Sequence, residues 1–396
     1  MENIFADRIS DVPRSFIREI LKVTADPDII SFAGGLPNRD YFPVKEIKEA
    51  CVKVLDSDGK TALQYSTSEG YPPLRKFIAD RYRERQGIDI DPDEIIITNG
   101  SQQGLDLIGK TLLNEGDHIG IENPGYLGAI QAFAIYKSVF HPVTLREDGI
   151  DVDELGATLK SYPVKVFYGV PNFQNPTGTT YSDETRKAIA GVMGRHSAFF
   201  IEDNPYGELR FIGPDIPLVR RYLPDKTILL GSFSKIAAPS FRLGWICVSR
   251  KIMDKIIIAK QASDLHTNYL SQRILSQYLE DNDIDRHIAV IREAYGRQRN
   301  AMVRMIREHF PEEVRCTEPE GGMFLWITLP PGLSSMELFE IAIREKVAFV
   351  PGIPFYACGG GENSMRLNFS NSDEGLIEEG IRRLGLSIRK MMGRRS

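Results

Sequence analysis

The sequence contains few cysteines, and they are widely separated. The four cysteines among its 396 residues are Cys51, Cys247, Cys316 and Cys358. No two of them form a C-x-x-C pair, and none lies in a tight cluster with the six histidines. This spacing excludes both a disulfide framework and a zinc site of the usual kinds, so we expect no bound metal. The cysteines are predicted to be buried, reduced thiols.

Long apolar runs are missing as well. No run of about 18 uncharged apolar residues occurs, although a membrane-spanning helix requires one. Residues 1–7 lack the charged segment and following apolar stretch that mark a secretory leader. The sequence therefore predicts a cytoplasmic protein with no membrane partner.

Charge of one sign does not accumulate along the chain. Lys and Arg number 49 against 54 Asp and Glu, and like charges form no long run apart from a short basic end at Arg394 and Arg395. A phosphate backbone would need a basic patch, so nucleic acid is excluded as a partner. With 42% hydrophobic and 26% charged residues, the composition is that of a globular protein of two to three domains.

The pattern of apolar residues predicts an α/β fold. Short β-branched segments alternate with helical patterns between residues 94 and 250, as is typical of a mostly parallel sheet. Seven strands are predicted, at residues 94–98, 118–122, 139–144, 164–170, 198–203, 227–232 and 244–249. A helical pattern then runs from 251 to about 309, and a smaller α/β region follows with strands at 321–326 and 365–369. We predict a large domain of residues 46–285 and a smaller α/β domain formed from both chain ends, residues 26–45 and 286–396.

One motif suggests a nucleotide-binding protein. Residues Gly104 to Thr111 match the P-loop pattern G-x-x-x-x-G-K-[ST], so a P-loop NTPase is an alternative reading. A P-loop must directly follow a strand, whereas the predicted strand ends six residues earlier, at Thr98. Leu105, Ile108 and Leu112 also follow the spacing of a helix face. We therefore interpret the motif as a coincidence inside a helix.

A more plausible anion site precedes that motif. The predicted strand ending at Thr98 leads through Asn99 and Gly100 to Ser101 and Gln102, at the start of a helix. The N–H groups and the macrodipole of a helix N-terminus favour anions. Taken alone, the segment fits an ordinary N-capped helix equally well.

A lysine stands just beyond another predicted strand. Lys235 follows Ser232 and Ser234, and Arg242 lies seven positions further on. Partial desolvation at a strand end would lower the pKa of this amine and make it competent to form a Schiff base. The hydroxyl groups and the guanidinium could bind a phosphate. Alone, the segment could equally hold a loop lysine beside a structural arginine.

Polar side chains also follow two neighbouring strands. Asn175 lies in the turn after residues 164–170, and Asp203 and Tyr206 lie at the end of the next strand. Individually these are ordinary turn, cap and packing residues. The carboxyl ends of strands in an open α/β sheet converge on one crevice, so we expect these side chains to surround one ligand together with Lys235.

This combination resembles the pyridoxal-phosphate-dependent aminotransferases of class I and II, which have fold type I. The likeness covers nearly the whole chain. It implies that Lys235 forms the Schiff base with pyridoxal 5'-phosphate, that Asp203 keeps the pyridine nitrogen protonated, and that Asn175 and Tyr206 bind the phenolic oxygen. It further implies a phosphate cup of Ser101, Gln102, Ser232, Ser234 and Arg242, and a ring of Tyr126 stacked on the pyridine.

The same resemblance implies a substrate site and an assembly. Arg366 matches the arginine that binds the substrate α-carboxylate, with Asn172 assisting and with Gly34 and Gly35 beside it. Tyr65 matches a tyrosine that reaches the phosphate of the neighbouring subunit, which implies a homodimer with shared active sites. The expected partners are an amino acid and a 2-oxo acid.

A narrower likeness concerns the 2-aminoadipate and kynurenine aminotransferases. It is carried by the segments 31–37, 64–70, 98–103 and 322–326. In that subgroup an N-terminal helix covers the substrate, which implies such an arm at residues 1–25, with Arg18 meeting a side-chain carboxylate. Alternatively, Arg18 is an exposed arginine on an amphipathic helix with no role in substrate binding.

The chemistry expected of such an enzyme assigns a task to each residue. Lys235 would act as the general base at the substrate Cα, with Asp203 supporting the ring that accepts the electrons. Transfer to a second 2-oxo acid gives ping-pong kinetics. A lyase or decarboxylase with the same cofactor would share these residues. A transcription regulator with a related domain would need an N-terminal DNA-binding module. Only about 28 residues precede the segment that begins at Ile29, which are too few for a winged helix.

Overall fold

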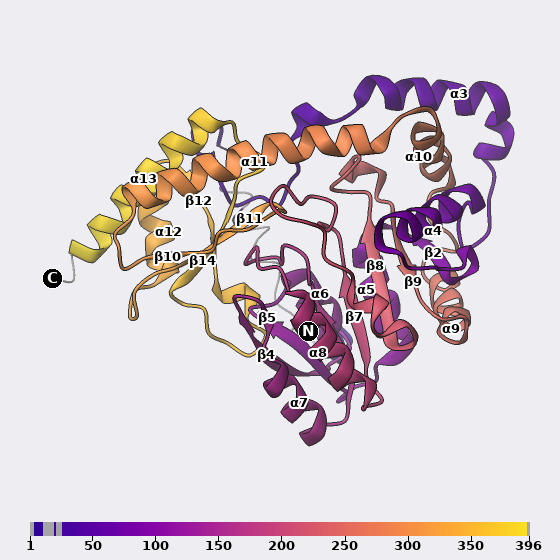
Figure 1. Ribbon diagram of the computed structural model, residues 1–396, viewed down its shortest axis with the longest axis horizontal. Coiled ribbons are helices and arrows are strands. Elements are labelled where there is room, and N and C mark those ends of the chain that lie inside the picture. The colour runs from indigo at the N-terminus through magenta and orange to yellow at the C-terminus, as the bar shows by residue number, and fades with distance from the viewer. Residues whose placement is uncertain (1–3, 11–19, 21–25, 394–396) are drawn as a thin grey trace.

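The computed structural model describes residues 4–10, 20 and 26–393 (Figure 1). Its helices are α1 (Asp7–Ser10), α3 (Val44–Ala62), α4 (Pro72–Gln86), α5 (Gly100–Leu112), α6 (Leu127–Ala134), α7 (Val152–Ser161), α8 (Asp183–Gly194), α9 (Arg250–Gln261), α10 (Tyr269–Asp281), α11 (Ile284–His309), α12 (Ser335–Arg344) and α13 (Glu374–Gly393). Its strands are β1 (Ile30–Ser31), β2 (Ile95–Thr98), β3 (His118–Asn123), β4 (Val139–Arg146), β5 (Gly149–Ile150), β6 (Val164–Gly169), β7 (Phe199–Asp203), β8 (Thr227–Ser232), β9 (Gly244–Cys247), β10 (Arg315–Cys316), β11 (Phe324–Thr328), β12 (Val347–Ala348), β13 (Val350–Pro351) and β14 (Ser364–Asn368).

The large sheet contains all seven strands predicted between residues 94 and 249. Its order in the described part of the chain is β2-β9-β8-β7-β6-β3-β4-β5. The central strands β8, β7, β6, β3 and β4 run parallel, whereas β9 is antiparallel to both of its neighbours. The α/β prediction is thus confirmed. An eighth strand, β5, adds to the edge beside β4, and its two residues are too few to give a sequence pattern.

Burial explains why the central strands are continuous apolar segments. All six residues of β8 and all four of β9 are buried, and α5 packs against both strands. Strands covered on both faces need apolar side chains at successive positions rather than at alternate ones. The polar residues of the site therefore stand at the strand ends, where the chain leaves the core.

The antiparallel strand β9 brings two distant turns together. Gly244, its first residue, pairs with Thr98 at the end of β2 and with Ser232 at the end of β8. A Cβ atom on Gly244 would lie 2.7 Å from the backbone of Gly100 and 2.8 Å from that of Gly231, so only glycine fits between them. The turn that begins α5 and the turn that follows β8 consequently lie side by side.

A smaller sheet of order β10-β11-β14-β13 forms beside the large one. The helical pattern predicted for residues 251–309 is divided into α9, α10 and α11. Asp283 caps α11 by accepting hydrogen bonds from the N–H groups of Asp285 and Arg286. Helix α11 extends from the neighbourhood of α10 to the small sheet, where it packs against α13 (Figure 1). Helix α11 therefore extends from the large-sheet part of the molecule to the small-sheet part.

The cysteines differ from the prediction of buried thiols. Only Cys247 is buried, whereas Cys51 and Cys316 are partly exposed and Cys358 is exposed. Cys51 lies on the amphipathic α3, and Cys358 precedes a loop of three glycines. No helix in the described ranges is long and apolar enough to cross a membrane.

Candidate active site

A cavity of about 390 Å³ opens at the carboxyl edge of the large sheet. Residues from the turns after β2, β3, β6, β7 and β8 line it together with residues of the small sheet. The predicted site residues on its wall are Gly35, Ser101, Gln102, Tyr126, Asn175, Asp203, Tyr206, Ser232, Ser234, Lys235, Arg242 and Arg366. The fold therefore brings together twelve of the predicted site residues, which span positions 35 to 366 of the chain.

Lys235 is positioned by the tight turn after β8. Its Nζ atom donates a hydrogen bond of 2.9 Å to the carbonyl oxygen of Gly35. Burial lowers the pKa of Lys235 to about 8, and the cations Arg366 and Arg242 contribute in the same direction. An amine with this pKa is partly unprotonated near neutral pH, which is what a nucleophile or a general base requires.

Asp203 is the buried acid at the end of β7. Its Oδ2 atom accepts a hydrogen bond of 2.8 Å from the hydroxyl of Tyr168, whereas its Oδ1 atom is buried and has no hydrogen-bond partner. Burial raises the pKa of Asp203 to about 6, against the opposing effect of the Tyr168 hydrogen bond. A buried carboxylate oxygen without a partner is costly, so this atom fits a cationic N–H group of a ligand.

Arg366 reaches the cavity from β14 of the small sheet. Its Nη1 atom donates to Oδ1 of Asn175 and its Nη2 atom donates to the carbonyl oxygen of Ala33, both at 2.8 Å. The guanidinium carbon lies 4.3 Å from the centre of the Phe324 ring. Burial lowers the pKa of Arg366 to about 10, so the group is still a cation at neutral pH. Its Nε atom is buried without a partner.

Asn175 also contacts Tyr206 on the cavity wall. The Nδ2 atom of Asn175 lies 3.4 Å from the hydroxyl of Tyr206. Burial raises the pKa of Tyr206 above its usual value, and burial likewise raises the pKa of Tyr126 to about 12. Both phenols are therefore neutral hydrogen-bond donors at physiological pH.

An anion site lies at the other end of the cavity, where α5 begins. Gly100 has a φ of +73°, and a Cβ atom there would lie 2.7 Å from Nη2 of Arg242. The Ser232 hydroxyl donates to that of Ser234 at 2.9 Å, and both line the cavity. Asn99 makes no side-chain capping bond to α5, contrary to the simple N-cap reading. A helix N-terminus, an arginine and two hydroxyls together suit a phosphate.

Three predicted residues lie away from this cavity. Asn172 accepts a bond of 2.7 Å from Arg186 and donates one of 2.7 Å to Asn204, so its amide bonds these residues here, and its assistance to Arg366 stays a prediction. Asn175 contacts Arg366 instead. The carbonyl oxygen of Gly34 accepts a hydrogen bond from Asn368, and Gly34 does not line the cavity. Tyr65 is 79% exposed and packs edge-on against His266.

Arg18 and most of the proposed arm, residues 1–25, lie outside the described residues. The structure also adds residues that the sequence analysis missed, namely Tyr168, Phe324, Leu36 and Pro239 on the cavity wall. Tyr168 was detectable in principle, because a tyrosine in an otherwise apolar strand needs a buried partner for its hydroxyl. The others are apolar residues with no distinguishing signal.

The P-loop motif lies inside a helix, as predicted. Residues Gly104 to Thr111 fall within α5, where Asp106 accepts a bond of 2.7 Å from Lys110 one turn later. A Cβ atom on Gly104 would lie 3.0 Å from Leu230, so this glycine packs against β8. The motif therefore provides no open phosphate loop.

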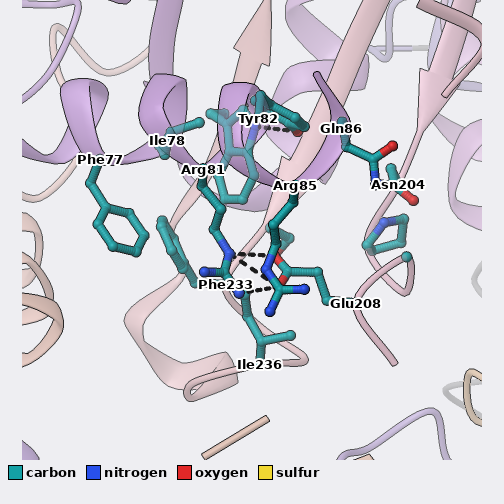
Figure 2. Close-up of a pocket in the computed structure, with 14 residues that line it drawn as sticks. Phe77, Ile78, Arg81, Tyr82, Arg85, Gln86, Asn204, Glu208, Phe233 and Ile236 are labelled. Carbon is teal, nitrogen blue, oxygen red and sulfur yellow. Dashed lines mark hydrogen bonds and ion pairs between the residues drawn. The ribbon is translucent and has the colours of Figure 1, made fainter. Parts of the chain in front are cut away.

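A second cavity, of about 50 Å³, shares Pro205 and Ser232 with the first as lining residues. Apolar and charged side chains line it, and Arg81 and Arg85 on α4 extend toward Glu208 (Figure 2). A space of this size admits a few water molecules but no cofactor. This second cavity is therefore not a cofactor site.

The fold and the larger cavity define an enzyme of fold type I, in which a lysine, a buried acid and an anion site share one sheet edge. The comparisons with known proteins agree. A sequence model of the family "Aminotransferase class I and II" matches residues 27–384. The aromatic-amino-acid aminotransferase 1 of Thermococcus litoralis is 42% identical over 99% of this chain and 95% of that protein. The 2-aminoadipate transaminase of Thermus thermophilus is 41% identical over 96% of this chain and 95% of that protein.

A solved structure gives the same result. The kynurenine aminotransferase of Pyrococcus horikoshii superimposes with a TM-score of 0.94 at 42% identity, over 98% of both chains. The chain belongs to the class I and II aminotransferases, the pyridoxal-phosphate-dependent family that the sequence resemblance indicated. Because these relatives are named as aminotransferases, they favour amino-group transfer over the lyase, decarboxylase and NTPase alternatives.

Proposed function

We propose that this aminotransferase holds pyridoxal 5'-phosphate in the 390 Å³ cavity and moves an amino group from an L-amino acid to a 2-oxo acid. One observation carries the cofactor assignment: the buried Oδ1 atom of Asp203 has no partner in the protein, and a protonated pyridine nitrogen would supply one. The anion site at the start of α5 suits the phosphate, and Lys235 suits the covalent attachment.

The protein groups divide the remaining work. When bound, pyridoxal phosphate supplies an electron sink for the bond that breaks at the substrate Cα. Asp203 would stabilise a protonated ring nitrogen, and Tyr126 would provide an aromatic wall for the ring. Lys235 removes the Cα proton, because its lowered pKa leaves part of the amine unprotonated.

Substrate orientation depends on Arg366 and Asn175. A guanidinium binds a carboxylate with two parallel hydrogen bonds, and the buried Nε atom of Arg366 has a donor to spare. We propose that it binds the α-carboxylate common to every amino acid and 2-oxo acid. Gly35 lies beside this position with its carbonyl oxygen toward Lys235.

The breadth of donors follows from the rest of the cavity. Leu36, Pro37 and Phe324 give its substrate end an apolar surface. The cations on the described wall are Lys235, Arg242 and Arg366, and each has a task already. An acidic side chain such as that of 2-aminoadipate would need another cation, for which we propose Arg18. Aromatic and branched-chain donors would use the apolar surface, in keeping with the names of the relatives.

We also propose a cytoplasmic homodimer with shared sites. Exposed apolar side chains gather on and just after α3: Val44, Val52, Leu55, Leu63 and Tyr65 are between 41% and 79% exposed. Such a group on one face is typical of a surface covered by a second subunit. Within each subunit, we propose a large domain of residues 46–285, which holds the eight-stranded sheet, and a small domain of residues 26–45 and 286–396; the pairing of β1 with β12 supports joining the two chain ends.

The experiment is a visible absorption spectrum of the purified protein, followed by a panel of amino donors with 2-oxoglutarate. We expect an absorbing cofactor band and transfer of amino groups, with formation of glutamate and the 2-oxo acid of each donor. A Lys235→Ala variant serves as the control and should transfer none. A colourless protein that cannot be reconstituted with pyridoxal phosphate would contradict the proposal.

A further inference from the structure

Glu122 is a buried carboxylate behind the active-site wall. It lies near the end of β3, is 1% exposed and does not line the cavity. It accepts hydrogen bonds from the N–H of Val170 at 2.8 Å, from Nε2 of Gln174 at 3.0 Å and from the hydroxyl of Tyr181. An ionised carboxylate is an acceptor only, and here every one of these three neighbours presents a donor to it.

Gln174 extends this arrangement into two loops. Its Nε2 atom also donates to the carbonyl oxygen of Pro124 at 3.0 Å. Its Oε1 atom accepts from the N–H of Thr177 at 2.9 Å and from the Thr177 hydroxyl at 2.8 Å. The amide is therefore used on both sides: Glu122 and the Pro124 carbonyl both require its N–H groups, and the Thr177 N–H requires its oxygen.

The two loops carry groups that line the cavity. Pro124 stands two residues before Tyr126, and Thr177 stands two residues after Asn175. Gly125 donates to the carbonyl oxygen of Phe355 at 2.7 Å, so the first loop is also tied to the 3-10 helix Ile353–Phe355, which follows β13. Any change that turned the Gln174 amide would break its bonds to Pro124 and Thr177 together.

We propose that Glu122 is a positioning residue for amino-group transfer: acting through Gln174, it holds Tyr126 and Asn175 at a fixed separation across the cofactor site. This inference rests on the proposed function. It assigns Glu122 no contact with substrate or cofactor. The carboxylate acts by accepting from Gln174, and this charge-assisted bond reinforces the amide orientation that the Pro124 carbonyl and the Thr177 N–H also require.

A matched control lies on the next strand but one. Glu202 on β7 is also fully buried, and it accepts from the N–H groups of Val219 and Arg220 at 2.9 Å each. Burial raises the pKa of both carboxyls above the usual value. The partners of Glu202 lie in a 3-10 helix, Val219–Arg221, and line no part of the active-site cavity.

The experiment compares Glu122→Gln with Glu202→Gln in the cofactor-loaded protein. Both variants lose an acceptor at a buried site, so both should unfold at a lower temperature. Only Glu122→Gln should release pyridoxal phosphate faster, shift the pH at which the visible band changes, and lose about 10- to 100-fold in kcat. Similar spectra, retention of cofactor and kcat for the two variants would overturn the proposal.

A second variant keeps the test decisive if Glu122→Gln does not fold. Gln174→Met leaves Glu122 its bonds to Val170 and Tyr181 but removes the connection to both loops. It should reproduce the loss of kcat and the spectral shift, and normal values would overturn the proposal. If the unmodified protein itself binds no pyridoxal phosphate, the proposed function fails rather than this inference.

Discussion

Nη1 of Arg366 donates a hydrogen bond of 2.8 Å to Oδ1 of Asn175, although Arg366 lies in the small sheet and Asn175 lies in a turn that follows a strand of the large one. Arg366 stands on β14 of the small sheet, and Asn175 follows β6 of the large one. The site is therefore completed only where the two sheets meet. A movement of one sheet relative to the other would alter the position of the guanidinium over the cavity.

The first prediction concerns this arginine. Arg366→Ala should lower kcat/KM for every donor, because all donors share the α-carboxylate. The loss should correspond to about 2–5 kcal/mol of transition-state stabilisation. The deficit should be similar for glutamate, leucine and phenylalanine, measured under identical conditions. Arg299→Ala is the control, since Arg299 bonds the carbonyl oxygen of Pro319 outside the cavity. A loss confined to one donor would contradict the assignment.

The second prediction concerns Lys235. Borohydride reduction of the loaded protein should fix pyridoxal phosphate to Lys235, as peptide mapping would show. Because its pKa is lowered to about 8, attachment to the apo protein should accelerate up to about pH 8 and then level off. Lys260→Met is the matched control, since Lys260 is fully buried but paired with Asp264. An adduct on another lysine would refute the proposal.

The third prediction concerns Asp203, whose replacement should stabilise the apo protein and reduce the activity of the loaded enzyme. Its folded-state pKa is raised to about 6, so folded apo protein retains a proton that the unfolded chain releases between about pH 4 and 6. Stability from this group is thus lost as the pH rises through that range. Asp203→Asn should raise the free energy of unfolding of apo protein at pH 7 by up to roughly 3 kcal/mol.

The same variant should retain the cofactor but slow Cα proton removal by about 100-fold or more, because the charge that supports the ring is gone. Tyr168→Phe is the milder companion, since it removes only the hydrogen bond to Oδ2. Calorimetry of the apo forms and single-turnover kinetics of the loaded forms measure the two effects. Near-normal turnover in Asp203→Asn would reject its role as the ring partner.

The fourth prediction concerns Tyr65, which is 79% exposed in the single chain. If it completes the phosphate site of a second subunit, mixing Tyr65→Phe and Lys235→Ala chains should create hybrid dimers with one intact site. Activity should then exceed that of either parent. Full activity in a strictly monomeric fraction would show that Tyr65 has no role in another subunit.

The fifth prediction addresses Arg18. Arg18→Ala should reduce activity with 2-aminoadipate and glutamate far more than with leucine or an aromatic donor, because only the acidic side chains would lose a partner. The expected difference is about 2–5 kcal/mol if the pair is desolvated. Donor panels on both proteins provide the measurement. Equal losses for acidic and apolar donors would leave Arg18 as a general part of a lid.

The residue pattern was sufficient to predict the main strands of the large sheet and the polar residues that end them. Seven strand segments were predictable because fully buried strands must be apolar throughout, and the polar residues at their ends stand out. Lys235, Asp203 and Asn175 were found this way, as was the helical nature of residues 104–111. These are local properties, set by residues only a few positions apart.

Which of these polar groups contact one another depends on the tertiary structure. The amide that contacts Arg366 is that of Asn175 rather than Asn172, because Arg186 and Asn204 occupy Asn172. Likewise, Tyr168 bonds Asp203 from a neighbouring strand, and Gly35 accepts from Lys235 across 200 positions. Such contacts depend on strand order and on the approach of two sheets. A hydrogen bond needs its atoms placed within a few tenths of an ångström, which the spacing of residues along a chain does not specify.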